Sequence, residues 1–114
     1  LAERLFTEGS SFADAWNFGP REDDAKSVEW IVSTMAKNWG ENASWNTESG
    51  DHPHEANYLK LDCSKAHSKL NWSPRWGLDE TLQRITSWHK SHLEGECARE
   101  LSLQQITDYM NEMK

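Results

Sequence analysis

Apolar residues recur at helical spacing along much of the chain. The clearest stripe starts after the N-cap candidates Asp23, Asp24 and Ser27 and stops before Gly40. Its members repeat at steps of three, four and seven residues, which places them on one face of a helix. They are Val28, Ile31, Val32, Met35 and Trp39. The pattern predicts a helix over residues 28–39.

The same periodicity predicts helices on both sides of this one. Residues 1–7 carry Leu1 and Leu5 on one face. A second long stripe runs from Leu78 to about residue 93, where Gly95 breaks it.

Two shorter helices complete the helical prediction. Asp62 can cap a helix in which Cys63, Ala66 and Leu70 share one side. Near the end of the chain, Ser102 is followed three residues later by a Gln, which is the spacing of a capping box. That motif predicts that the last helix begins at Ser102.

Three short segments have patterns typical of strands. Residues 12–18 form an apolar run that Gly19 and Pro20 end, which indicates a buried strand. Residues 43–46 are a second candidate, and residues 58–61 alternate polar and apolar as a half-buried strand does. Strands interspersed with helices predict the α/β class, with short strands and four to five helices.

Composition limits the kinds of partner. The 114 residues carry a formal net charge of −7, which argues against a nucleic-acid or anionic-membrane surface. Leu, Ile, Val and Phe make up 18 of the 114 residues, below the roughly 20% at which disorder becomes a concern. The seven Trp argue against disorder, because each can bury on the order of 150–250 Å² of surface. We therefore expect a fragment, one lobe of a larger protein.

The two cysteines favour a reducing compartment. Cys63 lies on the apolar side of its helix and is expected to be a buried thiol, whereas Cys97 lies in a polar stretch. They form no C-x-x-C pair and have no His at zinc spacing. No signal peptide and no membrane-spanning apolar stretch are visible, so we expect a cytoplasmic protein.

Candidate chemistry gathers around Pro53. The loop of residues 51–55 places His52, His54 and two carboxylates beside this rigid residue, just before the predicted strand at 58–61. A zinc site is the metal interpretation, but a His-x-His loop lacks the further ligands that zinc-site spacings show. We predict no metal, and a loop that holds an organic ligand.

Longer motifs carry a resemblance. They are Asn17-Phe18-Gly19-Pro20, His54-Glu55-Ala56-x-Tyr58-Leu59-Lys60-Leu61-Asp62, Ser64-Lys65-Ala66, Leu70-x-Trp72-x-Pro74 and Pro74-Arg75-Trp76. Over residues 1–93 the chain resembles the C-terminal lobe of the extended short-chain dehydrogenases that act on nucleotide sugars. Its details are most like the 4,6-dehydratases that convert CDP-glucose to CDP-4-keto-6-deoxyglucose.

The resemblance implies that catalysis and substrate binding lie on different parts of a longer enzyme. Such enzymes use bound NAD to oxidise the hexose at C4, eliminate water across C5–C6 and return the hydride. No Gly-rich dinucleotide loop occurs here. A catalytic Tyr-x-x-x-Lys pair is also absent, because the residues four positions after Tyr58 and Tyr109 are Asp62 and Met113. NAD is therefore expected on a missing N-terminal domain, and the fragment itself is not catalytic. Residues 1–93 would be the substrate lobe and 94–114 a helical tail of a homo-oligomeric enzyme.

The resemblance also implies substrate-binding residues. Related enzymes hold the ribose with a carboxylate at the position of Glu55, and two carboxylate oxygens can accept from both hydroxyls of a diol. His54 adjoins it, and His52 stands where relatives usually carry a phosphate-binding Arg. Arg21 follows the predicted strand at 12–18 and is the fourth candidate. A merely solvated Glu55 remains open.

A non-catalytic carbohydrate-binding module is the alternative function. Exposed Trp rings would form its platform, with the loop of residues 51–55 as a polar rim. We expect Trp72 and Trp76 to lie in the core, Arg75 to stack between them, and Lys65 to be a helix-surface charge. The arrangement of the Trp side chains, on one face or dispersed, separates the two functions.

Overall fold

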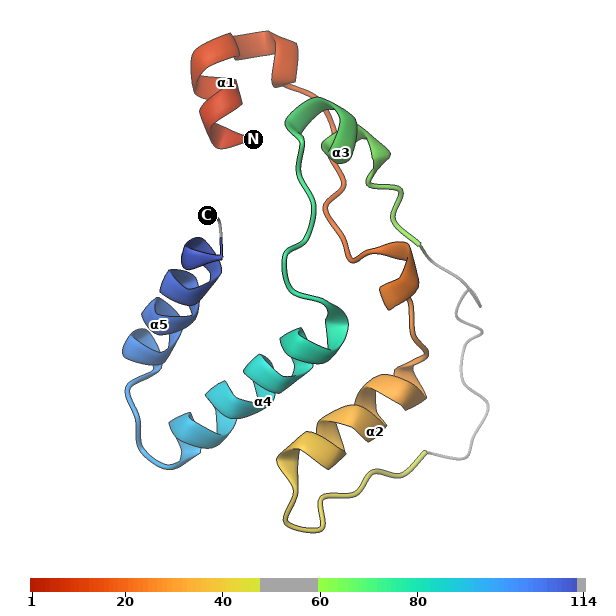
Figure 1. Cartoon of the computed structure of the whole chain (residues 1–114), viewed down its shortest axis with the longest axis vertical. Helices are drawn as coiled ribbons and strands as arrows, with labels where there is room; N and C mark the ends of the chain where they lie inside the picture. Colours follow the sequence, from red (N-terminus) through yellow and green to blue (C-terminus); the bar gives the residue numbers. More distant parts are fainter. Residues whose placement is uncertain (48–59, 113–114) are drawn as a thin grey trace.

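The structure, a computed structural model, describes residues 1–47 and 60–112. In these two ranges it consists of helices joined by irregular segments (Figure 1). The elements are α1 (Ala2–Glu8), the 3₁₀ turns η1 (Gly9–Phe12) and η2 (Glu22–Asp24), α2 (Val28–Trp39), α3 (Ser64–Leu70), α4 (Leu78–Leu93) and α5 (Ala98–Asn111).

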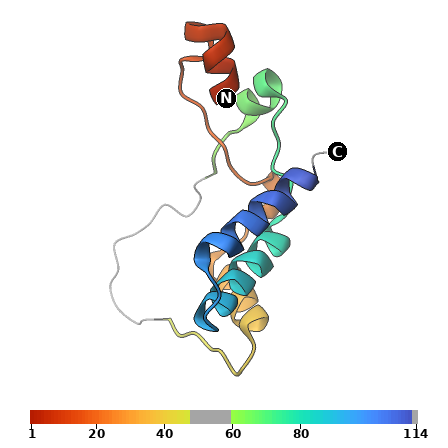
Figure 2. The ribbon, with the colours of Figure 1, turned by 90° about the vertical axis from the view of Figure 1, so that its left-hand side faces the viewer.

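Helix α4 lies between α2 and α5. It runs beside α2, and α5 folds back along its other side after a turn at Gly95 (Figures 1 and 2). Leu82 and Thr86, one turn apart, are the buried residues of α4. The Thr86 hydroxyl donates to the Leu82 carbonyl at 2.8 Å, so its burial leaves no polar group unpaired. The predicted helix over residues 78–93 is confirmed.

Helix α2 also matches its prediction. The Ser27 side chain accepts from the Trp30 backbone N–H at 3.2 Å, and Gly40 ends the helix with a φ of 73°. Lys90 of α4 donates to the Trp39 carbonyl at 2.8 Å. Because the last carbonyls of a helix lack intrahelical partners, this bond fixes the end of α2 to α4.

The predicted start of the last helix is wrong. Helix α5 begins at Ala98, four residues before the expected capping box. Ser102 lies inside the helix, where its hydroxyl donates to the Ala98 carbonyl at 2.8 Å. A Ser hydroxyl can bond either a free N–H at a helix start or a carbonyl one turn back, and sequence spacing does not distinguish the two.

The predicted strands are not confirmed. The predicted strand at residues 12–18 is wrong: Phe12 ends η1, and residues 13–20 form no strand pair. The Trp16 indole N–H donates to the Phe12 carbonyl at 3.0 Å, and the two rings stack at 5.8 Å. Such local bonds compete with a strand ladder, and Ala and Asp are poor strand formers. The described part of the chain therefore does not confirm the α/β class.

The two other strand predictions have different outcomes. Residues 43–46 are irregular, and the Trp45 indole N–H bonds the Ser33 hydroxyl at 3.2 Å. Of residues 58–61, the first two lie outside the described residues, and Lys60 and Leu61 are not in a strand.

Arg84 joins α4 to α5. Its guanidinium pairs with Glu80 one turn back at 2.9 Å, and with Asp108 and Glu112 of α5 at 3.2 and 3.3 Å. It also lies 3.9 Å above the centre of the Trp76 ring, whose N–H donates to Glu112 at 2.8 Å. These carboxylates, Glu80 foremost through its hydrogen bond, hold the pKa of Arg84 above its ordinary value.

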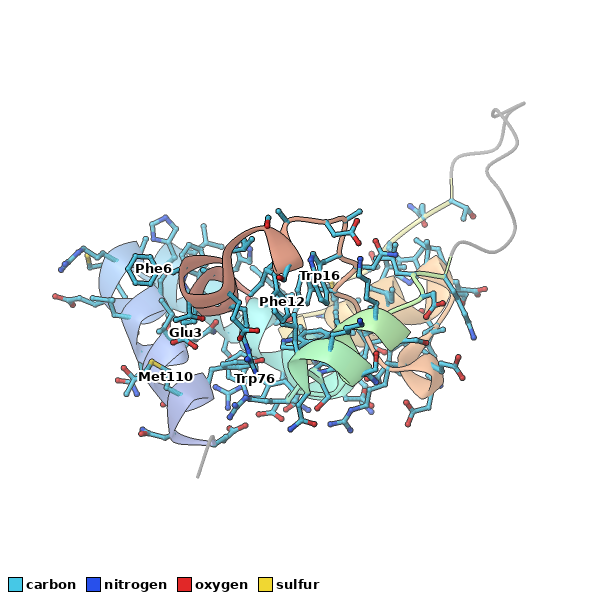
Figure 3. The ribbon with its side chains drawn as sticks, turned by 90° about the horizontal axis from the view of Figure 1, so that it is seen from above. Glu3, Phe6, Phe12, Trp16, Trp76 and Met110 are labelled. Carbon is cyan, nitrogen blue, oxygen red and sulfur yellow. The ribbon has the colours of Figure 1, made fainter. Side chains whose placement is uncertain are left out.

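Little of the described chain is buried. Cys63, Ala66, Leu82 and Thr86 are the buried residues, and Cys63 confirms the expected buried thiol. The radius of gyration is 17.9 Å, against about 13 Å for a compact chain of this length. Helix α1 has no buried residue, and Phe6 on it is 93% exposed (Figure 3). The structure is open, with large apolar side chains on its surface.

The sequence predicts no membrane-spanning stretch. Within residues 1–47 and 60–112, no helix combines the length and the apolar character that crossing a bilayer requires.

Removing the charge of Arg84 should loosen α5. Arg84→Met keeps an apolar stem over Trp76 but removes three ion pairs, so we expect the free energy of unfolding to fall by about 1–2 kcal/mol. The loss should shrink in 1 M salt, because partly exposed pairs are screened. Urea unfolding at low and high salt measures it. Arg99→Met, at an exposed position of α5, is the control, and equal losses in both variants would contradict the prediction.

Candidate functional site

Three irregular segments lie side by side, above α2 and α4 in the view of Figure 1. They are residues 13–21, 60–63 and 71–77, and their courses can be followed in Figure 1. Side chains rather than a backbone ladder join them. The Asn17 amide donates to the Asp62 carbonyl at 3.2 Å, and Arg21 donates to the Pro74 carbonyl at 3.0 Å. These bonds join the first segment to the other two, and residues 20–21 and 60–63 border one hollow.

The hollow has a volume of about 580 Å³. Its wall combines η2 and the start of α2 with residues 60–63 and the start of α3. Six charged side chains line it: Arg21, Lys26, Lys60, Glu22, Asp24 and Asp62. Its size suits a small organic molecule, and its mixed charge suits a ligand with both polar and ionic groups.

Arg21 is the predicted site residue that the structure describes. It lines the hollow, and its guanidinium donates to the carbonyls of Pro74 and Arg75 at 3.0 and 3.5 Å. The side chain therefore also holds the segment that leads into α4. Its role in substrate binding stays a prediction.

Three predicted site residues lie outside the described residues. These are Glu55, His54 and His52, together with the rest of the loop at 51–55. Lys60, the first described residue after them, lines the hollow. Within residues 1–47 and 60–112, no three His, Cys, Asp or Glu side chains are arranged to hold a metal ion.

Helix α3 begins at the floor of the hollow. Asp62 accepts from the Ser64 backbone N–H at 2.9 Å, and hydrogen bonds from Ser64 hold the pKa of Asp62 below its ordinary value. Cys63 lies beneath Gly19: a Cβ atom on Gly19 would be 3.3 Å from the Cys63 sulfur and 3.4 Å from a Leu61 methyl carbon. Only a residue without a side chain allows this approach without displacement.

Lys65 is more than a helix-surface charge. Its ammonium pairs with Asp14, donates to the Ala15 carbonyl at 2.9 Å and lies 4.7 Å from the centre of the Trp16 ring. It ties α3 to the segment that follows η1. No local pattern indicates this contact, because Lys65 and Asp14 are 51 residues apart.

The Trp side chains are dispersed. Phe18 meets Trp72 edge-on at 5.0 Å and Tyr109 meets Trp76 at 4.9 Å, and no ring contact in the described chain joins two Trp. Trp72 and Trp76 are half-buried, so the expectation that they lie in the core is wrong.

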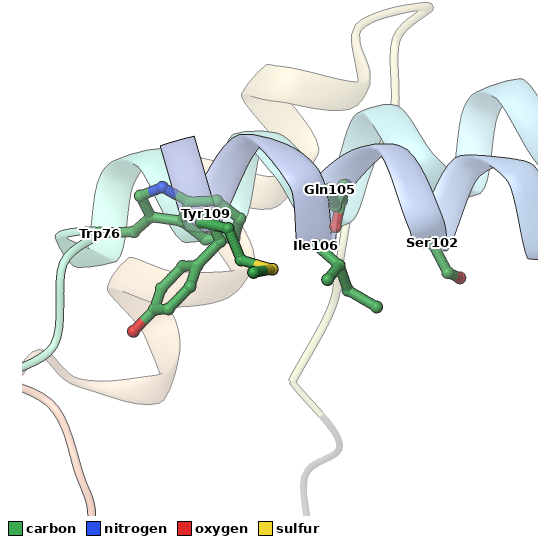
Figure 4. Close-up of a pocket in the computed structure, with 6 residues that line it drawn as sticks. Trp76, Ser102, Gln105, Ile106 and Tyr109 are labelled. Carbon is green, nitrogen blue, oxygen red and sulfur yellow. The ribbon is translucent and has the colours of Figure 1, made fainter. Parts of the chain in front are cut away.

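The expected stacking of Arg75 between Trp72 and Trp76 is also not observed. Arg75 lies over Tyr109 at 5.3 Å instead, and Arg84 occupies the Trp76 face. A second hollow, of about 350 Å³, lies beside these rings on α5 (Figure 4). Its lining residues are Trp76, Ser102, Gln105, Ile106, Tyr109 and Met110.

Comparison with known proteins identifies what the chain is similar to. It is 56% identical over 111 residues to the CDP-glucose 4,6-dehydratase of Salmonella typhimurium, which covers 97% of this chain and 31% of that enzyme. The resemblance to nucleotide-sugar dehydratases is confirmed. Over 33 residues the chain is also 48% identical to the GDP-mannose 4,6 dehydratase of Cricetulus griseus, covering 29% of this chain and 9% of that protein. No protein-family model matches it.

The extent of this similarity limits what it shows. The dehydratase resemblance extends over nearly the whole chain, but the chain spans less than a third of the Salmonella enzyme. The similarity therefore relates the chain to one part of a sugar 4,6-dehydratase, and the activity of the whole enzyme is a proposal.

Gly19→Ala should strain the packing around Cys63, which lines the larger hollow. The added methyl group would press on the Cys63 sulfur, and overpacking of this kind costs about 1–3 kcal/mol. Cys63→Ala removes that sulfur, so the double variant Gly19→Ala/Cys63→Ala should lose less stability than the sum of the single variants. Chemical unfolding of all four proteins completes the cycle, and strict additivity would show that the contact is unimportant.

The Asp14–Lys65 pair should give stability a dependence on pH. The hydrogen bond from Lys65, then that from the Ala15 N–H, holds the pKa of Asp14 below its ordinary value. A carboxyl whose folded pKa is lowered stabilises the fold above its unfolded pKa, and this contribution is lost as the pH falls below about 4. Asp14→Asn should therefore be less stable than the parent at pH 6 and approach it at pH 3. Thermal unfolding across that range measures both, and a constant difference would refute the assignment.

Proposed function

We propose that the chain is the substrate-binding part of a CDP-glucose 4,6-dehydratase. The observation that supports this is the 56% identity over 97% of the chain to the Salmonella enzyme of that name. Residues 1–93 are the proposed nucleotide-sugar lobe, and residues 94–114 are the proposed helical tail. The converted substrate is CDP-glucose, and the product is CDP-4-keto-6-deoxyglucose.

The hollow between η2, α2 and α3 is the proposed place of the nucleotide. Its volume of about 580 Å³ and its charged wall support this role. Glu55 accepts from the two ribose hydroxyls, and His54, His52 and Arg21 are the further proposed contacts. A carboxylate suits the diol, because charge-assisted O–H···O⁻ bonds are roughly twice as strong as neutral ones.

NAD does not fit the residues of the described chain. A dinucleotide site needs a strand, a Gly-rich turn and a helix start that together cradle the pyrophosphate. Residues 1–47 and 60–112 contain no strand, and the whole sequence lacks the Gly-rich motif. NAD, the hydride transfers and the catalytic Tyr-x-x-x-Lys pair therefore belong, in this proposal, to an N-terminal domain of a longer enzyme. Its homo-oligomeric state and cytoplasmic location remain predictions.

The carbohydrate-binding module receives no support from the arrangement of the aromatic rings. The ring partners of the paired Trp side chains lie on separate elements and are Phe12, Phe18, Tyr109 and three His residues. A sugar platform needs coplanar rings on one exposed face, and the described residues form none.

Glu55→Gln should weaken the binding of CDP by about tenfold to a hundredfold, the scale of one hydrogen bond to a charged group. The amide keeps the shape but removes the charge and presents a donor to hydroxyls that donate. The test uses the protein as its gene encodes it, with CDP affinity measured by calorimetry and stability by urea unfolding. Glu29→Gln, on the exposed face of α2, is the matched control.

The two measurements separate a binding role from a structural one. A loss of CDP affinity at unchanged stability supports the ribose contact. Wild-type CDP affinity in Glu55→Gln, or a loss of stability with intact CDP binding, would refute the ribose contact.

A further inference from the structure

The rim of the larger hollow has a balanced set of charges. Three cations, Arg21, Lys26 and Lys60, face three carboxylates, Glu22, Asp24 and Asp62. Their formal charges cancel. A nucleoside diphosphate carries about two negative charges or more, so each cation on this rim has a large effect on whether the hollow attracts or repels such a ligand.

The guanidinium of Arg21 is already engaged. Its Nη2 donates to the carbonyls of Pro74 and Arg75 at 3.0 and 3.5 Å, which sets its position beside the segment before α4. Using the same nitrogen for a ligand would weaken the bonds that hold that segment. Arg21 can therefore contribute its charge to the hollow, while a direct contact would have to come from its other nitrogens.

Lys26 is placed differently. It precedes Ser27, the N-cap of α2, and its ammonium lies 5.8 Å from the centre of the Trp30 ring on the first turn of that helix. Among the ion pairs within residues 1–47 and 60–112, none involves Lys26. Its stem is thus guided by an aromatic ring, while the charged end is exposed at the rim.

We propose that Lys26 binds the diphosphate of the nucleotide sugar. This rests on the proposed function, and it adds a phosphate contact that the motifs of the sequence did not indicate. An ammonium is a compact point charge with three donors, which suits phosphate oxygens whose exact positions differ between ligands. The partial positive charge at the start of α2 acts in the same direction. Without Lys26 the rim would carry a net negative charge.

The test compares ligands that differ only in phosphate. Lys26→Met keeps the stem on Trp30 and removes the charge, and Lys26→Arg keeps the charge. Lys37→Met, an exposed position further along α2, is the control. Calorimetry with CDP, CMP and cytidine, on the protein as its gene encodes it, gives the affinities at low and high salt.

Lys26→Met should bind CDP about tenfold more weakly, the lower end of the scale for a contact to a charged group. CMP should lose less and cytidine nothing. Lys26→Arg and Lys37→Met should stay within about twofold of the parent, and the loss for CDP should shrink at high salt.

Other results overturn the proposal in distinguishable ways. Unchanged CDP affinity in Lys26→Met, with a loss in Glu55→Gln, rejects Lys26 and leaves the proposed function standing. An equal loss for cytidine and CDP means that the substitution disturbs the hollow, and it also rejects the phosphate contact. Absence of CDP binding by the unsubstituted protein rejects both proposals.

Discussion

The contact between Arg84 and Trp76 joins α4 to the irregular segment that precedes it. Trp76 belongs to the irregular segment of residues 71–77, and Arg84 belongs to α4, against which α2 and α5 pack. Three carboxylates fix the guanidinium, and its carbon lies 3.9 Å from the centre of the Trp76 ring. Few buried apolar side chains are present to do this instead, so the positions of α5 and of the segment before α4 depend on this partly exposed cluster.

The helices could be predicted from the sequence, because their signals are local. The stripe from Val28 to Trp39 and the stops at Gly40 and Gly95 contain all that defines α2 and the end of α4. The start of α5 was misplaced, because Ser102 can bond forwards or backwards with equal chemistry. Strands need a partner elsewhere in the chain, and the apolar run at residues 12–18 contains no information about whether that partner is available.

The candidate site was predictable only in part, for the same reason. Arg21 was a candidate because it follows the strand predicted at residues 12–18, which the structure does not contain, and its bonds to Pro74 and Arg75 span more than 50 residues. Lys26 could not be recognised as a candidate from the sequence, because its position on the rim depends on the contact of η2 with residues 60–63. Long-range contacts between polar side chains and carbonyls have no periodicity that a sequence pattern could reveal.

An open structure of this kind separates stability from ligand binding. The clusters that hold the helices, around Arg84 and around Lys65, involve none of the proposed substrate contacts. The hollow is instead lined by residues 20–26 and the start of α2 on one side and by residues 60–63 and the start of α3 on the other, which a nucleotide bound at the proposed site would bridge. A ligand that binds only the folded chain stabilises it by about 2.7 kcal/mol at a hundred times its dissociation constant. For a chain with so small a core, that gain is comparable to the contribution of a whole side-chain cluster, so a substrate bound at the proposed site would be one of the interactions that hold the two sides of the hollow together.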